Sequence, residues 1–299
     1  MRVNINISDN KLRFTVLRLF LYLLVAFTCQ YCEKEVNIDL PQSDSKIVVE
    51  GWIEHDRYPH VILTRSAPYF ASIDSASLRD YVVTTAKVTI ITDDQSEVLT
   101  LKPNDAYFPP YVYFGTELKG EIHRTYNLRV EFGNVENNLS ASTYIPTLTE
   151  PDSVWFELEP ESDSLGRIWI SLSDNPGQTN YYRLLTKRKG KDKRYVANFK
   201  SAFSDKLFNG ETIVLGFTRG LADLLDLTRD NLFTLGDTIS VKFCSIDREH
   251  YEFWNTYQNE ILLSANPFSA SNAMIKSNIN NGLGVWGGYA ASYYIVIAK

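Results

Sequence analysis

Cysteine is scarce in this sequence, with three residues among 299. Three cysteines are too few for a disulfide framework. Two of them, Cys29 and Cys32, lie near the N-terminus, and the third is Cys244. If the N-terminal segment is removed, Cys244 is the one thiol of the folded body. We therefore expect disulfide bonds to play no part in holding the fold together.

The sequence also lacks the common catalytic and nucleotide-binding motifs. It contains no G-x-S-x-G, H-E-x-x-H, P-loop or G-x-G-x-x-G pattern. Without a visible nucleophile and base or a metal set, we predict no catalytic, cofactor-binding or metal-binding residue. The predicted protein is not an enzyme, and a secreted hydrolase is a minor alternative.

Only four histidines are present, and three of them could be imagined in a site. His55 and His60 flank a predicted turn and, with Asp56, could bind a metal ion. They lie five residues apart and lack a third strong ligand, which favours surface loop histidines. His250 follows Cys244 by six residues, but Cys244 lies in an alternating strand pattern. We expect an inert buried thiol there rather than a cysteine and histidine dyad.

Outside the N-terminus, basic residues are outnumbered by acidic residues. The chain carries a formal charge of −6, although its first 32 residues hold four basic side chains against one acidic side chain. Removing that segment takes away a charge of +3 and leaves about −9 on the rest of the chain. A body this acidic is a poor candidate for non-specific binding of nucleic acid.

A long apolar run is missing as well. Leu19 to Phe27 are nine consecutive apolar residues that follow a basic start. A membrane-spanning helix needs about 20 such residues, so this layout favours an export signal over residues 1–32. A buried first helix of the folded body is the minor alternative. The polar residues 33–45 then predict a tether.

The two N-terminal cysteines leave the end of that signal open. A bacterial lipoprotein signal ends in a cysteine whose thiol is acylated, preceded by small residues. Cys29 follows Thr28, which is tolerable, whereas Cys32 follows the bulky Tyr31. A redox pair needs a thioredoxin-like context and a zinc ribbon needs a second pair of ligands, and neither is present. We therefore favour a lipid anchor over plain secretion, with peptidase geometry favouring Cys29.

Aromatic residues are plentiful, with 18 Tyr, 16 Phe and 5 Trp, and this balance favours strands. Seven short strand patterns separated by turn signals lie between residues 46 and 147. They predict an immunoglobulin-like β-sandwich. Two prolines among polar residues in the segment Pro146 to Ser153 mark a domain boundary.

Residues 148–299 predict a second β-rich domain, again with about seven strand patterns. One stretch differs, because aromatic and aliphatic residues recur at helical spacing from Asp247 to Ser264. Asp247 can cap this helix. The segment Gly220 to Thr228 predicts a second, shorter helix.

Three further segments have unusual composition. Thr186 to Arg194 concentrates six basic residues around Gly190, which indicates a solvated hairpin turn or, as the alternative, a docking surface for an acidic partner or lipid headgroups. Ala106 to Gly115 holds five aromatic residues that either pack in the core or contact a protein or a sugar. The glycines of Gly282 to Tyr289 favour a turn or bulge with close backbone approach.

Taken together, "CEKEVNIDLP", "KIVVEGWIEHDRYPHVILTRSAPYF" and "NPFSASNAMIKSNINNGLGVWGGY" resemble a Bacteroidota lipoprotein family catalogued as domain of unknown function 4249. The resemblance extends from about Cys32 to the C-terminus. It implies lipidation at Cys32, with Cys29 as the alternative, and an outer-membrane lipoprotein on the periplasmic or cell-surface side. It also implies a non-enzymatic accessory of a TonB-dependent receptor in capturing a small nutrient that it does not identify. A structural or adhesive envelope lipoprotein is the alternative.

Overall fold

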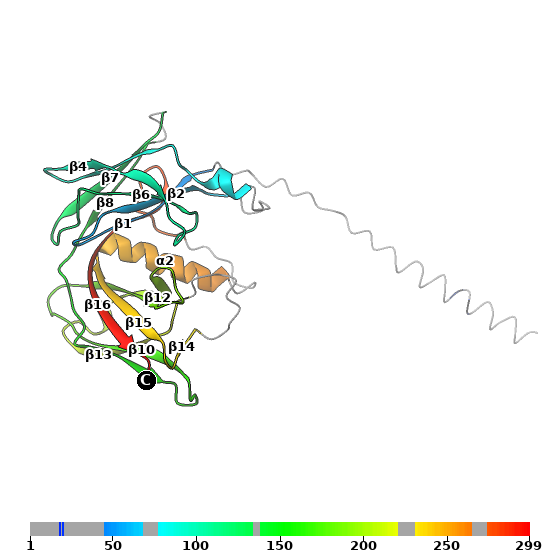
Figure 1. Ribbon diagram of the computed structural model, residues 1–299, viewed down its shortest axis with the longest axis vertical. Coiled ribbons are helices and arrows are strands. Elements are labelled where there is room, and N and C mark those ends of the chain that lie inside the picture. The colour runs from blue at the N-terminus through cyan, green and yellow to red at the C-terminus, as the bar shows by residue number, and fades with distance from the viewer. Residues whose placement is uncertain are drawn as a thin grey trace, which may run out of the picture. The chain divides into compact units, whose positions relative to one another are not determined.

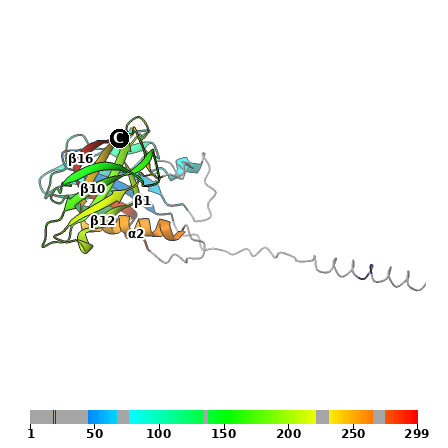
Figure 2. The same ribbon diagram turned by 90° about the horizontal axis from the view of Figure 1, so that it is seen from below.

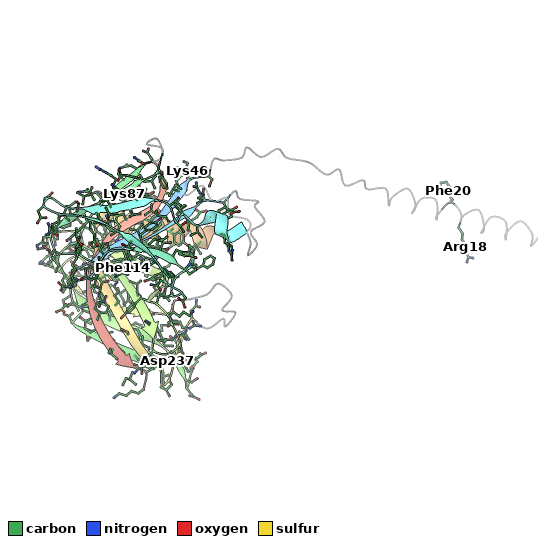
Figure 3. The ribbon with its side chains drawn as sticks, turned by 45° about the horizontal axis from the view of Figure 1, so that its top comes forward. Arg18, Phe20, Lys46, Lys87, Phe114 and Asp237 are labelled. Carbon is green, nitrogen blue, oxygen red and sulfur yellow. The ribbon has the colours of Figure 1, made fainter. Side chains whose placement is uncertain are left out.

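The computed structural model divides the chain into two compact units, Met1–Ser43 and Asp44–Lys299. It describes Arg18 and Phe20 of the first unit (Figure 3) and residues 45–67, 77–133, 138–220, 231–264 and 274–299 of the second. The candidate lipidation sites Cys29 and Cys32 lie outside the described residues. So do the rest of the predicted signal and, apart from Ser45, the predicted tether. Everything below concerns the second unit.

The second unit is mainly β, as predicted, with 50% strand and 10% helix. Its largest element is an eight-stranded sheet in the order β12-β11-β15-β16-β1-β2-β6-β5. Neighbouring strands are antiparallel except β1 and β16, which run parallel with Val48 opposite Leu283 and Glu54 opposite Tyr289. The strands are β12 (Val196–Ser204), β11 (Tyr181–Arg188), β15 (Thr238–Ile246), β16 (Leu283–Ile297), β1 (Ile47–Glu54), β2 (His60–Arg65), β6 (Tyr111–Phe114) and β5 (Thr100–Pro103).

One half of this large sheet packs against a small sheet from the N-terminal segment. The small sheet has the order β4-β3-β7-β8, with β4 at Ser96–Val98, β3 at Lys87–Ile91, β7 at Thr125–Glu131 and β8 at Leu139–Tyr144. Alternate residues of β7 face inward, as a half-buried strand requires. Val88 and Leu128 of the small sheet share one apolar core with Val49 and Trp286 of the large sheet.

The other half packs against a second small sheet. This sheet holds β13 (Thr212–Phe217), β10 (Leu165–Ser173) and β14 (Phe233–Thr234), and β9 (Ser153–Leu158) pairs with β10. Ile170 and Phe217 share a second core with Tyr182 and Phe243 of the large sheet. Lys87, in the first small sheet, and Asp237, just before β15, lie towards opposite ends of the unit (Figure 3).

The two predicted domains, 46–147 and 148–299, therefore do not have a sheet each. The eight-stranded sheet takes strands from both sides of the boundary at Pro146 to Ser153 and forms one layer of both sandwiches. Ile279, Trp286 and Ala290 of the C-terminal segment complete the core of the N-terminal sandwich. Alternating hydrophobicity predicts that a segment forms a strand, but it does not predict which strand that segment pairs with.

The predicted helix is present as α2 (Arg248–Ser264). Asp247 caps it, because its Oδ1 accepts a hydrogen bond of 2.8 Å from the backbone N–H of His250. The other carboxylate oxygen accepts a bond of 2.9 Å from the N–H of Tyr144, which ties the start of the helix to the end of β8. The helix α2 contacts β12 and β16, and Figures 1 and 2 show it beside β12. The shorter predicted helix, Gly220 to Thr228, lies outside the described residues except for Gly220.

Two short 3₁₀ helices, Ser77–Tyr81 and Asp205–Leu207, complete the described elements. No helix in the described part of the chain combines the length and the apolar character that crossing a membrane requires.

Candidate binding pocket

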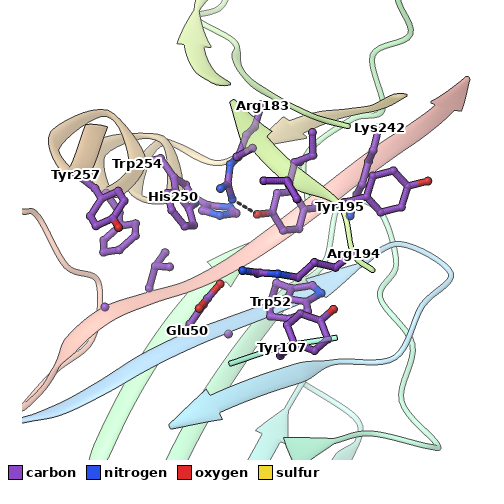
Figure 4. A pocket seen from close by; sticks show the side chains of 18 of the residues that line it. Glu50, Trp52, Tyr107, Arg183, Arg194, Tyr195, Lys242, His250, Trp254 and Tyr257 are labelled. Carbon is purple, nitrogen blue, oxygen red and sulfur yellow. Dashed lines mark hydrogen bonds between the residues drawn. The ribbon is translucent and has the colours of Figure 1, made fainter. Parts of the chain in front are cut away.

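A pocket of about 700 Å³ lies on one face of the eight-stranded sheet. Its lining comes from β1, β11, β12, β15 and β16, from α2, and from the loop that precedes β6 (Figure 4). Alternation along β15 explains which side chains reach it. Val241 and Phe243 face the second core, whereas Lys242 and Cys244 point to the opposite side. We call that opposite side the pocket face.

A buried ionic cluster lies at the base of the pocket face. Lys242 of β15 forms an ion pair with Glu54 of β1, and the hydroxyl of Tyr293 donates a hydrogen bond to the same carboxylate. Arg57 approaches Glu54 at 3.0 Å. Burial alone would lower the pKa of Lys242, but the neighbouring Cys244 and Glu54 raise it above its usual value. We assign the rise to Glu54, because burial raises the pKa of the Cys244 thiol to about 12 and keeps it neutral.

Arg183 of β11 is a buried cation in this pocket, with 4% of its surface exposed. Its Nη1 donates a hydrogen bond of 2.5 Å to the hydroxyl of Tyr289, and its Cζ lies 3.5 Å from the centre of a Trp254 ring (Figure 4). Its Nε has no hydrogen-bond partner, and no carboxylate of the described residues forms an ion pair with it.

His250 of α2 is buried between these groups, and its ring centre lies 4.7 Å from that of Tyr289. Burial, with a further effect of Arg183, lowers the pKa of His250 well below its usual value. The ring lies directly on the backbone of β16, because a Cβ at Gly287 would overlap it. The glycine-rich segment therefore provides the predicted close approach, but inside a strand and not in a turn.

Aromatic side chains form another wall of the pocket. The ring of Trp52 stacks on His60, with 5.0 Å between centres and 6° between planes. Tyr107 lies 5.5 Å from Trp52, and the Cζ of Arg194 lies 5.5 Å from the centre of the Tyr107 ring. Tyr195 holds its position through a hydroxyl contact of 2.7 Å with Ser240 (Figure 4).

The aromatic segment Ala106 to Gly115 is divided between the first core and the pocket, and its contact with a protein or a sugar stays a prediction. Tyr107 lines the pocket, whereas Tyr113 is buried in the first core. Phe108 and Tyr111 are exposed and line no part of the pocket.

The basic segment Thr186 to Arg194 is divided in the same way. It forms the hairpin between β11 and β12, in which Arg188 pairs with Asp192 and Lys191 pairs with Asp237. Three other cations of this segment line the pocket, namely Lys187, Lys193 and Arg194.

The candidate metal site does not form. The Nε2 of His55 lies 4.0 Å from the carboxylate of Asp56, and its Nδ1 accepts a hydrogen bond of 3.1 Å from the N–H of Ala291. The prediction that His60 lies in a surface loop is wrong. His60 begins β2, where stacking on Trp52 leaves it half-buried. No group of three or more metal-ligating side chains occurs among the residues that the structure describes.

The protonation states of Cys244 and His250 do not suit a catalytic cysteine and histidine dyad. A catalytic pair needs a thiolate beside a protonated imidazole. Burial keeps Cys244 as a thiol, and it keeps His250 neutral. The prediction that the Cys244 thiol is buried is confirmed, and its low reactivity stays a prediction.

The charges of the lining oppose the acidity of the whole chain. Five cations line the pocket against one carboxylate, Glu50, which is exposed. Glu54 neutralises Lys242, whereas no described carboxylate forms an ion pair with the other four cations, Arg183, Lys187, Lys193 and Arg194. The pocket is therefore locally positive in a protein of formal charge −6.

A family model described as Domain of unknown function (DUF4249) matches residues 33–294. No curated protein matches the sequence.

Proposed function

Because the chain belongs to the DUF4249 family, whose description names no activity, we propose a function from the pocket. The protein is a lipid-anchored, non-enzymatic binding protein of the outer membrane. It captures a small ligand and passes it to a TonB-dependent receptor.

The pocket carries this proposal. Its volume of about 700 Å³ falls within the range of roughly 300–1,000 Å³ that small-molecule sites occupy. Such sites combine aromatic walls with a few well-placed polar groups. Tyr107, Trp254 and Tyr257 supply aromatic surface here, and Arg183 supplies a polar group at depth.

The protonation states of the buried groups support binding rather than catalysis. A general acid or base works best with a pKa near the operating pH. The pKa of Lys242 is raised, that of the Cys244 thiol is raised to about 12, and that of His250 is well below its usual value. None of the three changes its charge near neutral pH.

The short apolar N-terminal segment supports a lipid anchor. The resemblance to the family favours Cys32 as the lipidated residue. Mass spectrometry of the mature N-terminal peptide tests it directly. We expect an acylated peptide that begins with Cys32. A peptide that begins with Cys29 would move the anchor by three residues, and an unmodified one would remove it.

Copurification tests the partnership with a receptor. We expect a β-barrel receptor to accompany the full chain when it is extracted in mild detergent. A protein that comes out alone, under conditions that preserve other envelope complexes, contradicts this part of the proposal.

A matched pair of variants tests the role of the pocket. Tyr107 lines it, whereas Tyr111, in the same aromatic segment, is exposed and does not. Across a panel of sole nutrients, a strain with Tyr107→Ala should grow more slowly than a strain with Tyr111→Ala on at least one. Equal growth on every nutrient would favour a structural or adhesive envelope protein.

A further inference from the structure

Arg183 is the feature of the pocket that the fold itself does not explain. A buried charge normally has a counter-ion, because removing it from water costs several kcal/mol even after relaxation. The nearby cation Lys242 follows this rule through Glu54. Arg183 does not, since no described carboxylate forms an ion pair with it.

The contacts of Arg183 hold it without neutralising it. Trp254 faces the guanidinium, and Tyr289 accepts a hydrogen bond from Nη1. A guanidinium has five N–H donors. That bond to Tyr289 is its one hydrogen bond to a side chain of the described residues, and Nε has none. These contacts therefore fix the position of the guanidinium and leave some of its N–H donors free to bind a ligand.

The rest of the lining favours a ligand that accepts hydrogen bonds over one that donates them. Three more cations that pair with no described carboxylate lie on the β11 and β12 hairpin, and the single carboxylate, Glu50, is exposed. A neutral sugar brings several hydroxyl donors, which need acceptors in the site. An oxyanion brings acceptors only, and it matches the fork of donors that arginine presents.

We propose that the ligand is a small organic anion whose carboxylate or phosphate group binds the guanidinium of Arg183. The same anion carries a ring, which contacts the aromatic wall that includes Trp52 and Tyr107. This inference rests on the proposed function, because it identifies the chemistry of the molecule that the pocket captures. Lys187, Lys193 and Arg194 attract the anion to the entrance of the pocket.

Three small probes test the inference on the full chain in mild detergent, by ligand-observed NMR titration. Benzoate and phenyl phosphate carry the two oxyanions, and benzamide is a neutral match for benzoate. At least one of the two anions should bind about tenfold or more tightly than benzamide, as charge-assisted hydrogen bonds require. The tighter of the two identifies the source as a carboxylate or a phosphate.

Variants then test whether Arg183 causes the preference for the anion over benzamide. Arg183→Met should reduce it to less than about twofold and leave the affinity for benzamide unchanged, since it removes charge but keeps bulk. Arg183→Lys should retain part of it, because it keeps the charge without the fork. Arg129→Met is the matched control, since Arg129 is exposed on β7 and should leave the preference intact. Circular dichroism confirms that each variant is folded.

Several results would overturn the inference while the proposed function stands on its own tests. Benzamide could bind as tightly as both anions, or none of the three probes could bind. The preference could also survive Arg183→Met, in which case the guanidinium is a structural partner of Trp254 and Tyr289 only. Loss of the receptor in copurification, or equal growth of the two tyrosine variants, would instead count against the proposed function.

Discussion

The two faces of the eight-stranded sheet carry opposite chemistry on the same strands. Along β15, Val241 and Phe243 enter an apolar core, whereas the alternate residues Lys242 and Cys244 lie on the pocket face, where Lys242 lines the pocket. Along β11, Leu184 enters the core and Arg183 faces the pocket. Both faces are buried, so burial alone does not distinguish a stabilising side chain from one available for binding.

The difference shows where the protein accepts an energetic cost. Apolar burial on the core face contributes roughly 25 cal/mol for each Å² removed from water. On the pocket face, charges lose hydration, and their partners return only part of that loss. We expect substitutions on the core face to reduce stability most and those at the depth of the pocket to reduce it least.

The largest effect should come from the core face. Phe243→Ala removes a fully buried ring that lies 5.3 Å from Tyr182, and should lower the free energy of unfolding by about 3–5 kcal/mol. Phe108→Ala, at a ring that is 69% exposed, should change it by less than about 0.5 kcal/mol. Urea denaturation measures both, and similar losses would contradict the comparison.

The buried ion pair should come next. Lys242→Met leaves Glu54 without its main partner, which typically costs about 3–5 kcal/mol. Because Arg57 and Tyr293 remain on that carboxylate, we expect about 2–3 kcal/mol. Lys87→Met breaks an exposed pair with Glu131 and should cost less than about 1 kcal/mol. An equal loss in the two variants would show that burial adds nothing to the Lys242 pair.

The third effect depends on pH. The folded state keeps His250 neutral, so its contribution is fully present above a pH of about 6.5, the usual pKa of the unfolded chain, and is lost as the pH falls below it. One proton costs about 1.4 kcal/mol per pH unit, which gives roughly 1–2 kcal/mol between pH 6.5 and 5.

His60 adds a loss of the same sign, because burial lowers its pKa too. The raised pKa of Asp247 acts in the opposite direction, at lower pH. His250→Gln should therefore flatten part of the slope in urea titrations between pH 5 and 7. A slope identical to that of the unmodified protein would show that His250 becomes protonated without unfolding.

The smallest effect should come from Arg183. Arg183→Met replaces a buried cation that pairs with no described carboxylate by an apolar side chain of similar length. The relief of desolvation should roughly offset the lost contacts to Trp254 and Tyr289, so the free energy of unfolding should change by less than about 1 kcal/mol. Thermal unfolding without ligand measures it. A loss of more than about 2 kcal/mol would mean that Arg183 serves stability.

Local structure was predictable from local pattern. The runs HVILTR, TIVLGF and TISVKFCSI each predict a strand, and they coincide with β2, β13 and β15. The cap of α2 at Asp247 follows from residue type alone. The run SYYIVIA predicts a last strand that starts at Ser292, but β16 begins nine residues earlier, because Gly284 to Gly288 form strand where glycine usually favours turns.

The pocket was predictable only in part. Its lining includes the half-buried Tyr107 and Arg194, which belong to segments that the sequence marks as unusual. Its depth was missed, because Arg183 and Trp254 lie in patterns typical of a core. A signal was present, since a cation inside an otherwise apolar strand, as in "YYRLLTK" or "TISVKFCSI", needs a partner or a ligand.

The parallel pairing of β1 with β16 affects how the chain acquires its fold. The centre of the large sheet forms only when residues near Val48 meet residues near Leu283, so the first sandwich waits for a strand synthesised much later. Such long-range pairing slows folding. A nascent N-terminal half therefore lacks Ile279, Trp286 and Ala290, which complete its core.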